Sequence, residues 1–548
     1  MNYKKILSSS ESKVSRLFHY FERHFFLALI ILFVASLSVR LYLTDYDTVL
    51  REESYGYVLK SLEITKGSFV PILNHAIGLS LFMSPFFYFF GSESIFQNMI
   101  YARIISNVIG ALSIFPLAYI GKKILDKKSL IVLIVLFAFS PGLMIYDTEV
   151  FPEPLFIFLF ITSVFFIIKA MENQNYILAS AVFGGLAYYV RFNGIVILPI
   201  ILLSFFLLRK QIPKFDYKYL IYIVAVFFAV SAPLMYQRYA DFGSPFFHGD
   251  SSKYFVDERF KAFGSENIPV PSLMEYLRTH TFTDYLDKFV IHGFLGIIYD
   301  YFFYSVSPLV LFFFLYGAAR HFNDVRFAPF ISIFLIWVMS FIPVWHIYHE
   351  ARYLYPTIPF ILIFSAIGIN DVIKDRRYGY ILLSLFLIVF VPFSLKASAD
   401  DLNAYTASDI ERDGLEWGRW AAQNIQGKIA IIEGGDLIMM HLPDSAIAGV
   451  SLFDIYAPES NLSTVRPGYF ENLSSAMVWF NELGVTHLAL DDRTIHKRPY
   501  LKEVYPGRKI PQYLTEVYSN YNTDSKWKMR IYRINWPEYW KRNDSDKK

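Results

Sequence analysis

Residues 24–43 read HFFLALIILFVASLSVRLYL, and Arg51-Glu52-Glu53 follow a short distance further along the chain. The first stretch has the roughly 20 apolar residues that a helix needs to cross the hydrocarbon core of a bilayer. The second places carboxylates near the end of that crossing, where a charge is costly unless it is solvated, paired or functional. This part of the sequence therefore predicts a membrane protein that carries its chemistry at one surface of the bilayer.

Two further polar clusters follow apolar runs in the same way. Asp147, Glu149 and Glu153 follow the third run, and Glu350 and Arg352 follow the ninth. Nearly all Lys/Arg clusters lie at the opposite ends of the runs, the side that the positive-inside rule assigns to the cytoplasm. We therefore expect the three polar clusters to meet on the outer face of the membrane.

The composition of the chain excludes several classes of protein. Of the 548 residues, 55% are hydrophobic and 19% are aromatic, which is too apolar for a soluble protein of this length. The chain has no cysteine, so disulfides, cysteine-bound zinc and a thiol nucleophile are impossible. Its basic residues gather in short loops, which leaves a nucleic-acid role without support.

The apolar runs predict a polytopic α-helical domain over residues 24–397, which follows a basic cytoplasmic N-terminus at residues 1–23. We expect about eleven transmembrane helices, at residues 24–43, 98–120, 129–146, 153–170, 176–190, 194–208, 219–237, within 289–317, and at 328–347, 355–370 and 379–397. This arrangement places the chain in the cell membrane as a multi-pass protein.

Outer loops are expected at residues 44–97 and 238–287. The first loop has two surface elements, at residues 54–66 and 77–90. The second of these is short and contains Pro85, so we expect it to lie on the membrane surface instead of crossing it.

Residues 398–548 differ from the rest of the chain because their apolar fraction drops and helix and strand signals alternate. Ser408 is placed to cap a helix that runs to residue 424. Strands are expected at residues 428–432, 486–490 and 528–534. We therefore predict a soluble extracytoplasmic α/β domain that is large enough to bury its own core.

The first outer loop carries the most informative spacing. Glu53 is followed by Tyr57, then by Ser61 and Gly67. By its chemistry alone, an acid that opens a helix either interacts favourably with the helix dipole or serves as a general base. The order of an acid, a tyrosine four residues on and a small residue eight on resembles the first outer loop of GT-C fold glycosyltransferases.

More narrowly, the spacing resembles the protein-mannosyltransferase-like group, which includes aminoarabinose transferases that act on lipid A. Further segments resemble this family in the same order, at residues 74–78, 102–110, 184–191 and 352–359. His75 stands where the family often has a His-Pro-Pro turn, and Arg103 lies in the segment that begins its second span. The resemblance therefore extends over most of the predicted membrane domain.

The resemblance implies an inverting transfer from a polyprenyl-phosphate-linked sugar to a hydroxyl of a protein, lipid or glycan. The family's base is usually Asp, and Glu53 takes that position in this chain. Glu52 is the alternative base. The other interpretation of the glutamate at this position is that the chain has lost its activity. Tyr57, His75 and Arg103 would bind the donor or the acceptor.

The second outer loop, with Asp147, Glu149 and Glu153, has two readings. The resemblance implies an acid that orients the acceptor or, in oligosaccharyltransferase relatives, binds a divalent metal. Asp147 and Glu149 would offer oxygen ligands to a hard cation, the one cofactor that the sequence suggests. The alternative is a solvated loop with an acid at a helix start. The chain lacks the Trp-Trp-Asp-Tyr-Gly motif of true oligosaccharyltransferases.

The segment with Glu350, Arg352 and Tyr353 also has two readings. Arg352 could anchor a helix at the interface, together with neighbouring tyrosines. The resemblance favours a grip on the lipid phosphate, which a guanidinium can hold through two hydrogen bonds. Arg191 is the other basic residue on the side of the membrane where the acidic clusters lie, and we interpret it in the same way, as a ligand of the lipid phosphate.

We therefore interpret the sequence as a membrane-bound glycosyltransferase acting at the outer membrane face. Its partners would be a polyprenyl-phosphate sugar, the acceptor and membrane lipids, with no nucleic acid. Two other classes stay open, a transporter or lipid flippase and a catalytically inactive scaffold. A transporter would carry ionisable residues in mid-span and mirrored halves, and neither is evident.

Overall fold

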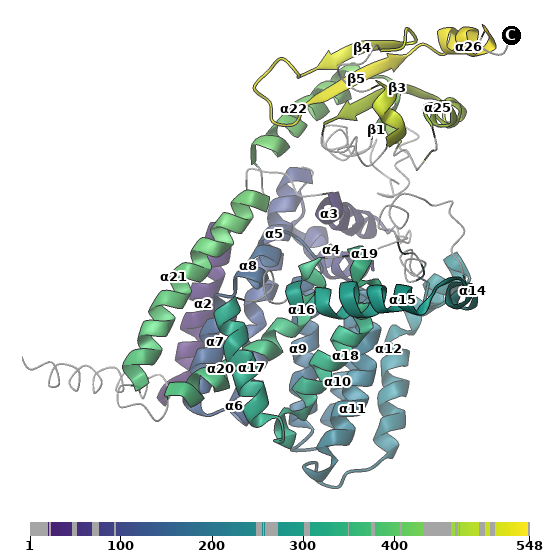
Figure 1. Ribbon diagram of the computed structural model, residues 1–548. Coiled ribbons are helices and arrows are strands. Elements are labelled where there is room, and N and C mark those ends of the chain that lie inside the picture. The colour runs from purple at the N-terminus through teal and green to yellow at the C-terminus, as the bar shows by residue number, and fades with distance from the viewer. Residues whose placement is uncertain are drawn as a thin grey trace, which may run out of the picture.

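The computed structural model describes residues 20, 23–46, 52–67, 76–92, 95–247, 255, 257, 272–300, 307–348, 350–373, 379–405, 408–431, 462–465, 470, 472–492, 499–504 and 510–545. A helical bundle makes up most of the molecule, and a smaller sheet domain lies beyond one end of it (Figure 1). We call this end of the bundle, where α3, α4 and α19 lie, the sheet-side end.

The bundle is built from helices that follow the apolar runs of the sequence. Their bounds are α2 (Phe25–Leu43), α3 (Glu52–Thr65), α4 (Gly78–Phe90), α5 (Ile95–Leu112), α6 (Ile114–Ile124), α7 (Lys127–Ala138), α8 (Pro141–Thr148), α9 (Glu153–Lys169), α10 (Tyr176–Val190), α11 (Ile197–Leu207), α12 (Lys218–Phe242), α14 (Leu273–Thr279), α15 (Phe282–Tyr285), α16 (Gly296–Asp300), α17 (Pro308–His321), α18 (Ala328–Phe341), α19 (Trp345–Tyr348), α20 (Ile358–Ile373) and α21 (Gly379–Tyr405). Large buried aromatic side chains fill the interior, and Phe160 of α9 stacks on Trp337 of α18 with 5.6 Å between the ring centres.

The described part of the chain holds 7 helices that are long and apolar enough to cross a membrane, or 8 if α7 and α8, bent by 42°, form one span. This count is lower than the predicted eleven. The remaining three predicted spans correspond to shorter helices, α9 with 17 residues, α10 with 15 and α17 with 14. The helices nevertheless identify the chain as a multi-pass membrane protein.

The predicted span within residues 289–317 has a different course. The segment from α15 through a π-helix (Leu286–Leu295) to α16 lies across the sheet-side end, and only α17 runs along the bundle (Figure 1). The π-helix contains Asp287, Lys288 and His292, which would be costly in the hydrocarbon core. Their presence explains why this segment does not enter the bundle as a straight span.

The surface element predicted at residues 77–90 is α4, at the sheet-side end (Figure 1). Its 13 residues span about 20 Å, less than the roughly 30 Å of a bilayer core. Gly78 at its start packs against the end of α10, because a Cβ there would lie 2.5 Å from the carbonyl of Tyr189. This close approach holds α4, and α3 packed on it, against the end of α10.

The C-terminal region folds as the predicted α/β domain. Its bounds are α22 (Ser408–Asn424), β1 (Gly427–Ile431), β2 (Leu462–Val465), α25 (Leu473–Glu482), β3 (Val485–Asp491), β4 (Leu514–Ser519), β5 (Met529–Ile534) and α26 (Trp536–Ser545). The sheet order is β2-β1-β3-β5-β4, with β2, β1 and β3 parallel and β5 and β4 antiparallel to their neighbours. Trp417 of α22 packs in one core and Phe480 of α25 in the other.

The predicted helix at 408–424 and the three predicted strands are confirmed, whereas β2 and β4 were not predicted. Residue 398, where the outer domain was expected to begin, falls inside α21. This helix continues without a break to Tyr405 and points from the bundle toward the sheet domain (Figure 1).

Candidate functional site

The first predicted element of the site is the start of α3. Glu52 and Glu53 form the first turn of this helix, and their side chains lie outside the described part of the structure, as does the whole of His75. Tyr57, one turn further on, is buried, and the hydroxyls of Ser61 and Ser80 donate hydrogen bonds to its carbonyl at 2.6 and 3.0 Å. The bond from Ser80 of α4 ties α3 to α4 one turn after the predicted base.

Arg191 lies directly after α10, where α4 packs. Its guanidinium forms an ion pair with Glu153, the first residue of α9, and lies 4.9 Å from the centre of the Tyr353 ring. The phenol of Tyr57 is close enough to interact with it electrostatically. The pair therefore brings together three segments that were predicted separately, the first outer loop, the second outer loop and the segment before α20.

The Glu153 carboxylate is buried and its Oε2 atom has no hydrogen-bond partner within the described part of the chain. Arg191 uses Nη1 for this carboxylate, out of the five N–H donors that a guanidinium carries. Its side chain is 14% exposed, so the remaining donors can reach a ligand at the edge of the cluster.

Arg352 is the second guanidinium of this cluster. Its Nε atom lies 2.6 Å from Oε2 of Glu350, and its Cζ atom lies 5.3 Å from the Tyr353 ring centre and 5.4 Å from that of Phe151. Two guanidinium groups thus rest on one tyrosine ring, an arrangement that cation–π attraction supports. We call Arg191, Arg352, Tyr353, Glu153 and Glu350 the double-arginine cluster.

A second ion pair was not predicted from the sequence. Arg40 of α2 is fully buried, and its Nε atom donates to Oδ2 of Asp147 in α8 at 2.7 Å. Its Nη1 atom donates to the carbonyls of Ala138 at 2.9 Å and Ser36 at 3.3 Å. The signal in the sequence was an arginine inside an apolar span, which is rarely without a partner.

Helix α5 lines the Arg40–Asp147 pair with a polar face. Gly110 faces the Asp147 carboxylate, Asn107 donates to the Thr44 hydroxyl at 2.9 Å, and Arg103 is buried one turn before Asn107. These three α5 residues follow one another at helical spacing, so they share a side of the helix. Glu149, just beyond α8, is also buried.

Aromatic contacts join the two ion-pair regions. The ring of Tyr146, the neighbour of Asp147, lies 5.2 Å from the ring of Phe151 and 4.8 Å from that of Tyr355. Phe151 in turn contacts Arg352. The structure therefore collects Tyr57, Glu153, Arg191, Glu350, Arg352 and Tyr353 in one region and places Arg103, Asp147 and Glu149 around α5 and α8 beside it.

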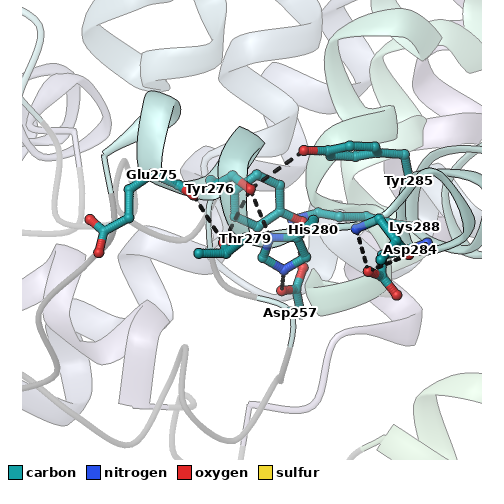
Figure 2. Close-up of polar contacts among 9 residues, drawn as sticks. Asp257, Glu275, Tyr276, Thr279, His280, Asp284, Tyr285 and Lys288 are labelled. Atoms are coloured by element: carbon teal, nitrogen blue, oxygen red, sulfur yellow. Dashed lines mark hydrogen bonds and ion pairs between the residues drawn. The ribbon is translucent and has the colours of Figure 1, made fainter.

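A third polar cluster, also not predicted, surrounds Asp257 (Figure 2). Its Oδ1 atom accepts hydrogen bonds from the Tyr276 hydroxyl at 2.6 Å and from Lys288 Nζ at 3.1 Å, and its Oδ2 atom pairs with Nε2 of His280 at 2.7 Å. Burial alone would raise the Asp257 pKa, but the bonds from Tyr276 and Lys288 lower it overall. This cluster ties residue 257 to α14 and the π-helix and lies on elements other than those of the ion pairs.

The sequence predicted that Asp147 and Glu149 could hold a divalent metal ion. Asp147 already has a guanidinium partner, and among the described residues no group of three or more His, Asp or Glu side chains could hold a metal ion. Arg40 therefore lies beside the Asp147 carboxylate, where the metal was predicted, and the divalent cation stays a prediction.

Comparisons with known proteins identify the fold. The family model described as dolichyl-phosphate-mannose-protein mannosyltransferase matches residues 74–236, less than half of the chain. No curated protein matches the sequence.

Several solved structures resemble most of the chain. The Archaeoglobus fulgidus oligosaccharyltransferase AglB, in complex with an inhibitory peptide and a dolichol-phosphate, is 15% identical with a TM-score of 0.56, over 93% of this chain and 74% of that one. The same organism's oligosaccharyltransferase in complex with Zn and sulfate is 13% identical with a TM-score of 0.55, over 84% and 68%. ArnT from Cupriavidus metallidurans bound to undecaprenyl phosphate is 12% identical with a TM-score of 0.51, over 92% and 97%. These similarities show that the chain has the GT-C fold.

Proposed function

We propose that this protein transfers a sugar from a polyprenyl-phosphate-linked donor to an acceptor hydroxyl at the outer membrane face. The observation that carries the proposal is the double-arginine cluster, which lies where α4 and α3 pack on the end of α10. Both AglB and ArnT, which share the fold, have been solved with a polyprenyl-type phosphate bound.

The phosphate of the donor is assigned to the two guanidinium groups. Arg191 has donors that Glu153 does not use, and Tyr353 holds the faces of both arginines in place. Charge-assisted hydrogen bonds from arginine to phosphate are short and strong. As the bond to the sugar breaks, negative charge grows on the phosphate, and the same donors stabilise that charge.

The base is assigned to Glu53, with Glu52 as the alternative. The carboxylate takes the proton of the acceptor hydroxyl, and the acceptor oxygen forms a bond to the anomeric carbon. The bond between that carbon and the phosphate oxygen breaks, and its electron pair stays on the lipid phosphate. Attack from the side opposite the leaving group inverts the anomeric centre. The assignment is supported by Tyr57, which is buried one turn after Glu53 and interacts electrostatically with Arg191.

The remaining predicted residues are assigned to the surroundings of the reaction. Arg103 and Glu149 are buried near α5 and α8, and His75 belongs to the loop before α4. The N-terminus would be cytoplasmic, and the sheet domain would lie outside the membrane, where it covers the site or binds the acceptor.

Incubation of the purified protein with radiolabelled polyprenyl-phosphate sugars tests the proposal. A glycosyltransferase consumes the donor and releases the lipid phosphate, and Arg352→Ala should abolish that release. Movement of intact donor across a vesicle membrane without consumption would instead identify a flippase. Neither consumption nor movement would identify an inactive scaffold.

A further inference from the structure

We propose that Arg40 takes the place of a divalent cation beside Asp147, so that the enzyme needs no metal. The inference rests on the proposed transfer reaction and assigns Arg40 as a positioning residue for Asp147. It begins from one contact, the 2.7 Å bond between Nε of Arg40 and Oδ2 of Asp147, in which both side chains are buried.

Arg40 is held in position by more than the carboxylate. Its Nη1 atom donates to the carbonyl of Ala138, the last residue of α7, and to that of Ser36 in its own helix. The carbonyl end of a helix carries partial negative charge, which favours a cation there. Arg40 thus bridges the bend between α7 and α8, with a carbonyl on one side and a carboxylate on the other.

The Asp147 carboxylate has little freedom to leave this partner. A Cβ at Gly110 would lie 2.2 to 2.4 Å from the carboxylate atoms, so the carboxylate already rests against the backbone of α5. Glycine at position 110, which has no side chain, therefore leaves room for the Arg40–Asp147 pair. A rotated carboxylate would leave the Arg40 charge buried and unpaired, which is strongly unfavourable.

The fixed charge of Arg40 also opposes a metal ion directly. A divalent cation bound by Asp147 would sit close to the guanidinium, in a buried region where like charges repel with little screening. The carboxylate oxygen that Arg40 does not use, Oδ1, takes part in no hydrogen bond within the described part of the chain. We assign this oxygen to a hydroxyl of the substrate, with Arg40 keeping the carboxylate oriented.

Binding of Mn²⁺ to the purified full-length protein, followed by the loss of its free electron paramagnetic resonance signal, tests the idea without any enzymatic activity. Wild type and Asp147→Asn should bind Mn²⁺ equally weakly. Arg40→Gln should gain a site that Arg40→Gln/Asp147→Asn lacks, because the uncovered carboxylate then seeks a cation. The matched control Arg238→Gln removes another buried arginine, one that rests on Phe192, and should gain no site.

A wild-type Mn²⁺ site that Asp147→Asn removes would overturn the proposal. This comparison uses only wild type and Asp147→Asn, so it decides the matter even if Arg40→Gln fails to fold.

Turnover gives the second readout. Wild-type transfer should be unchanged by EDTA, whereas Arg40→Gln should lose roughly a hundredfold in kcat, the scale expected when a substrate-holding group is misplaced. Added Mn²⁺ should restore part of that loss, and Arg40→Lys should keep more activity than Arg40→Gln. A wild-type enzyme that EDTA stops and Mn²⁺ restarts would contradict the inference. Absence of transfer under every condition would instead count against the proposed function, and the Mn²⁺ titration would still decide the role of Arg40.

Discussion

The Arg191 guanidinium carbon lies 4.9 Å from the centre of the Tyr353 ring, and this contact joins the end of α10 to the segment that leads into α20. Arg352 rests on the same ring at 5.3 Å. Cation–π attraction holds a guanidinium by its face and does not use its N–H donors. The Tyr353 ring therefore holds the guanidinium groups of Arg191 and Arg352 close to each other.

Replacement of Arg352 tests the phosphate assignment. Arg352→Lys keeps the charge but cannot form two parallel hydrogen bonds, so we expect a loss of donor affinity, and Arg352→Ala should lose more. Binding of the donor to both variants in the same detergent is the measurement. A residue that only anchors a helix at the interface would tolerate lysine, because lysine can extend to the headgroups. Equal affinities for wild type and Arg352→Lys would remove Arg352 from the site.

Separate replacement of the two glutamates at the start of α3 identifies the general base. Glu53→Gln should lower turnover by roughly a hundredfold or more, the usual scale for a lost general base, whereas Glu52→Gln should cost much less. Single-turnover transfer with saturating donor is the measurement. The reverse order of effects would assign the base to Glu52, and full activity in both variants would place it elsewhere.

Gly110→Ala should disturb Asp147 through its size alone. The new methyl group would lie 2.2 to 2.4 Å from the atoms of the Asp147 carboxylate, which its ion pair with Arg40 holds in place, so we expect a destabilisation of about 1–3 kcal/mol. Gly121→Ala is the matched control, because the nearest atoms there are the flexible ends of Leu130 and Leu133. Thermal unfolding in detergent should show a clear decrease only for Gly110→Ala. Similar thermal unfolding midpoints for Gly110→Ala and Gly121→Ala would mean that the Asp147 carboxylate can move aside.

The Asp257 cluster predicts a pH-dependent contribution to stability. The folded state lowers the Asp257 pKa below its ordinary value of 3.8, since the bonds from Tyr276 and Lys288 outweigh burial. Stability from this carboxylate is therefore fully present above pH 3.8 and is lost as the pH falls through the lower folded-state pKa. The difference in unfolding midpoint between wild type and Asp257→Asn should shrink as the pH falls below 3.8.

Lys288→Met supplies the control for the Asp257 prediction. If the two side chains act through one ion pair, the double variant should be no less stable than the worse single variant. Fully additive losses would show that the bond between Lys288 and Asp257 contributes little.

Introduced cysteines test the orientation in the membrane, because the natural chain has none. Lys123→Cys lies at the predicted cytoplasmic side, and Val478→Cys lies on an exposed position of α25 in the sheet domain. In intact cells an impermeant maleimide should label position 478 and leave position 123 unlabelled. The opposite labelling would invert the topology and move the reaction to the cytoplasmic face.

The sequence predicted those parts of the fold that depend on local patterns. The helix from Ser408 to Asn424 was predicted because its cap and apolar spacing are both within one segment. Most spans followed from apolar runs, since bilayer thickness sets their length. Residues 289–295 of the π-helix lie within the range predicted to hold a span, and the bond from Lys288 to Asp257, which ties the start of this helix to the outer loop, is not visible in the sequence.

The site was predictable only in part. Glu153, Arg191 and Arg352 came from the family resemblance, and the structure brings them together around Tyr353. Arg40 was missed because its partner, Asp147, is 107 residues away and no local pattern links the two. Buried ion pairs between distant helices are a property of packing, which a single sequence does not display.

Helix α21 carries the chain without a break from the bundle toward the sheet domain. Its 27 residues extend for about 40 Å, which is more than the roughly 30 Å of a bilayer core. About 10 Å of this helix can therefore extend beyond the bilayer core, on the side of the sheet domain. One residue added to its exposed end would raise the point where the chain leaves it by about 1.5 Å and turn that point by about 100°. The length of α21 thus sets, in steps of one residue, the height and the direction at which the chain leaves the helix toward the sheet domain.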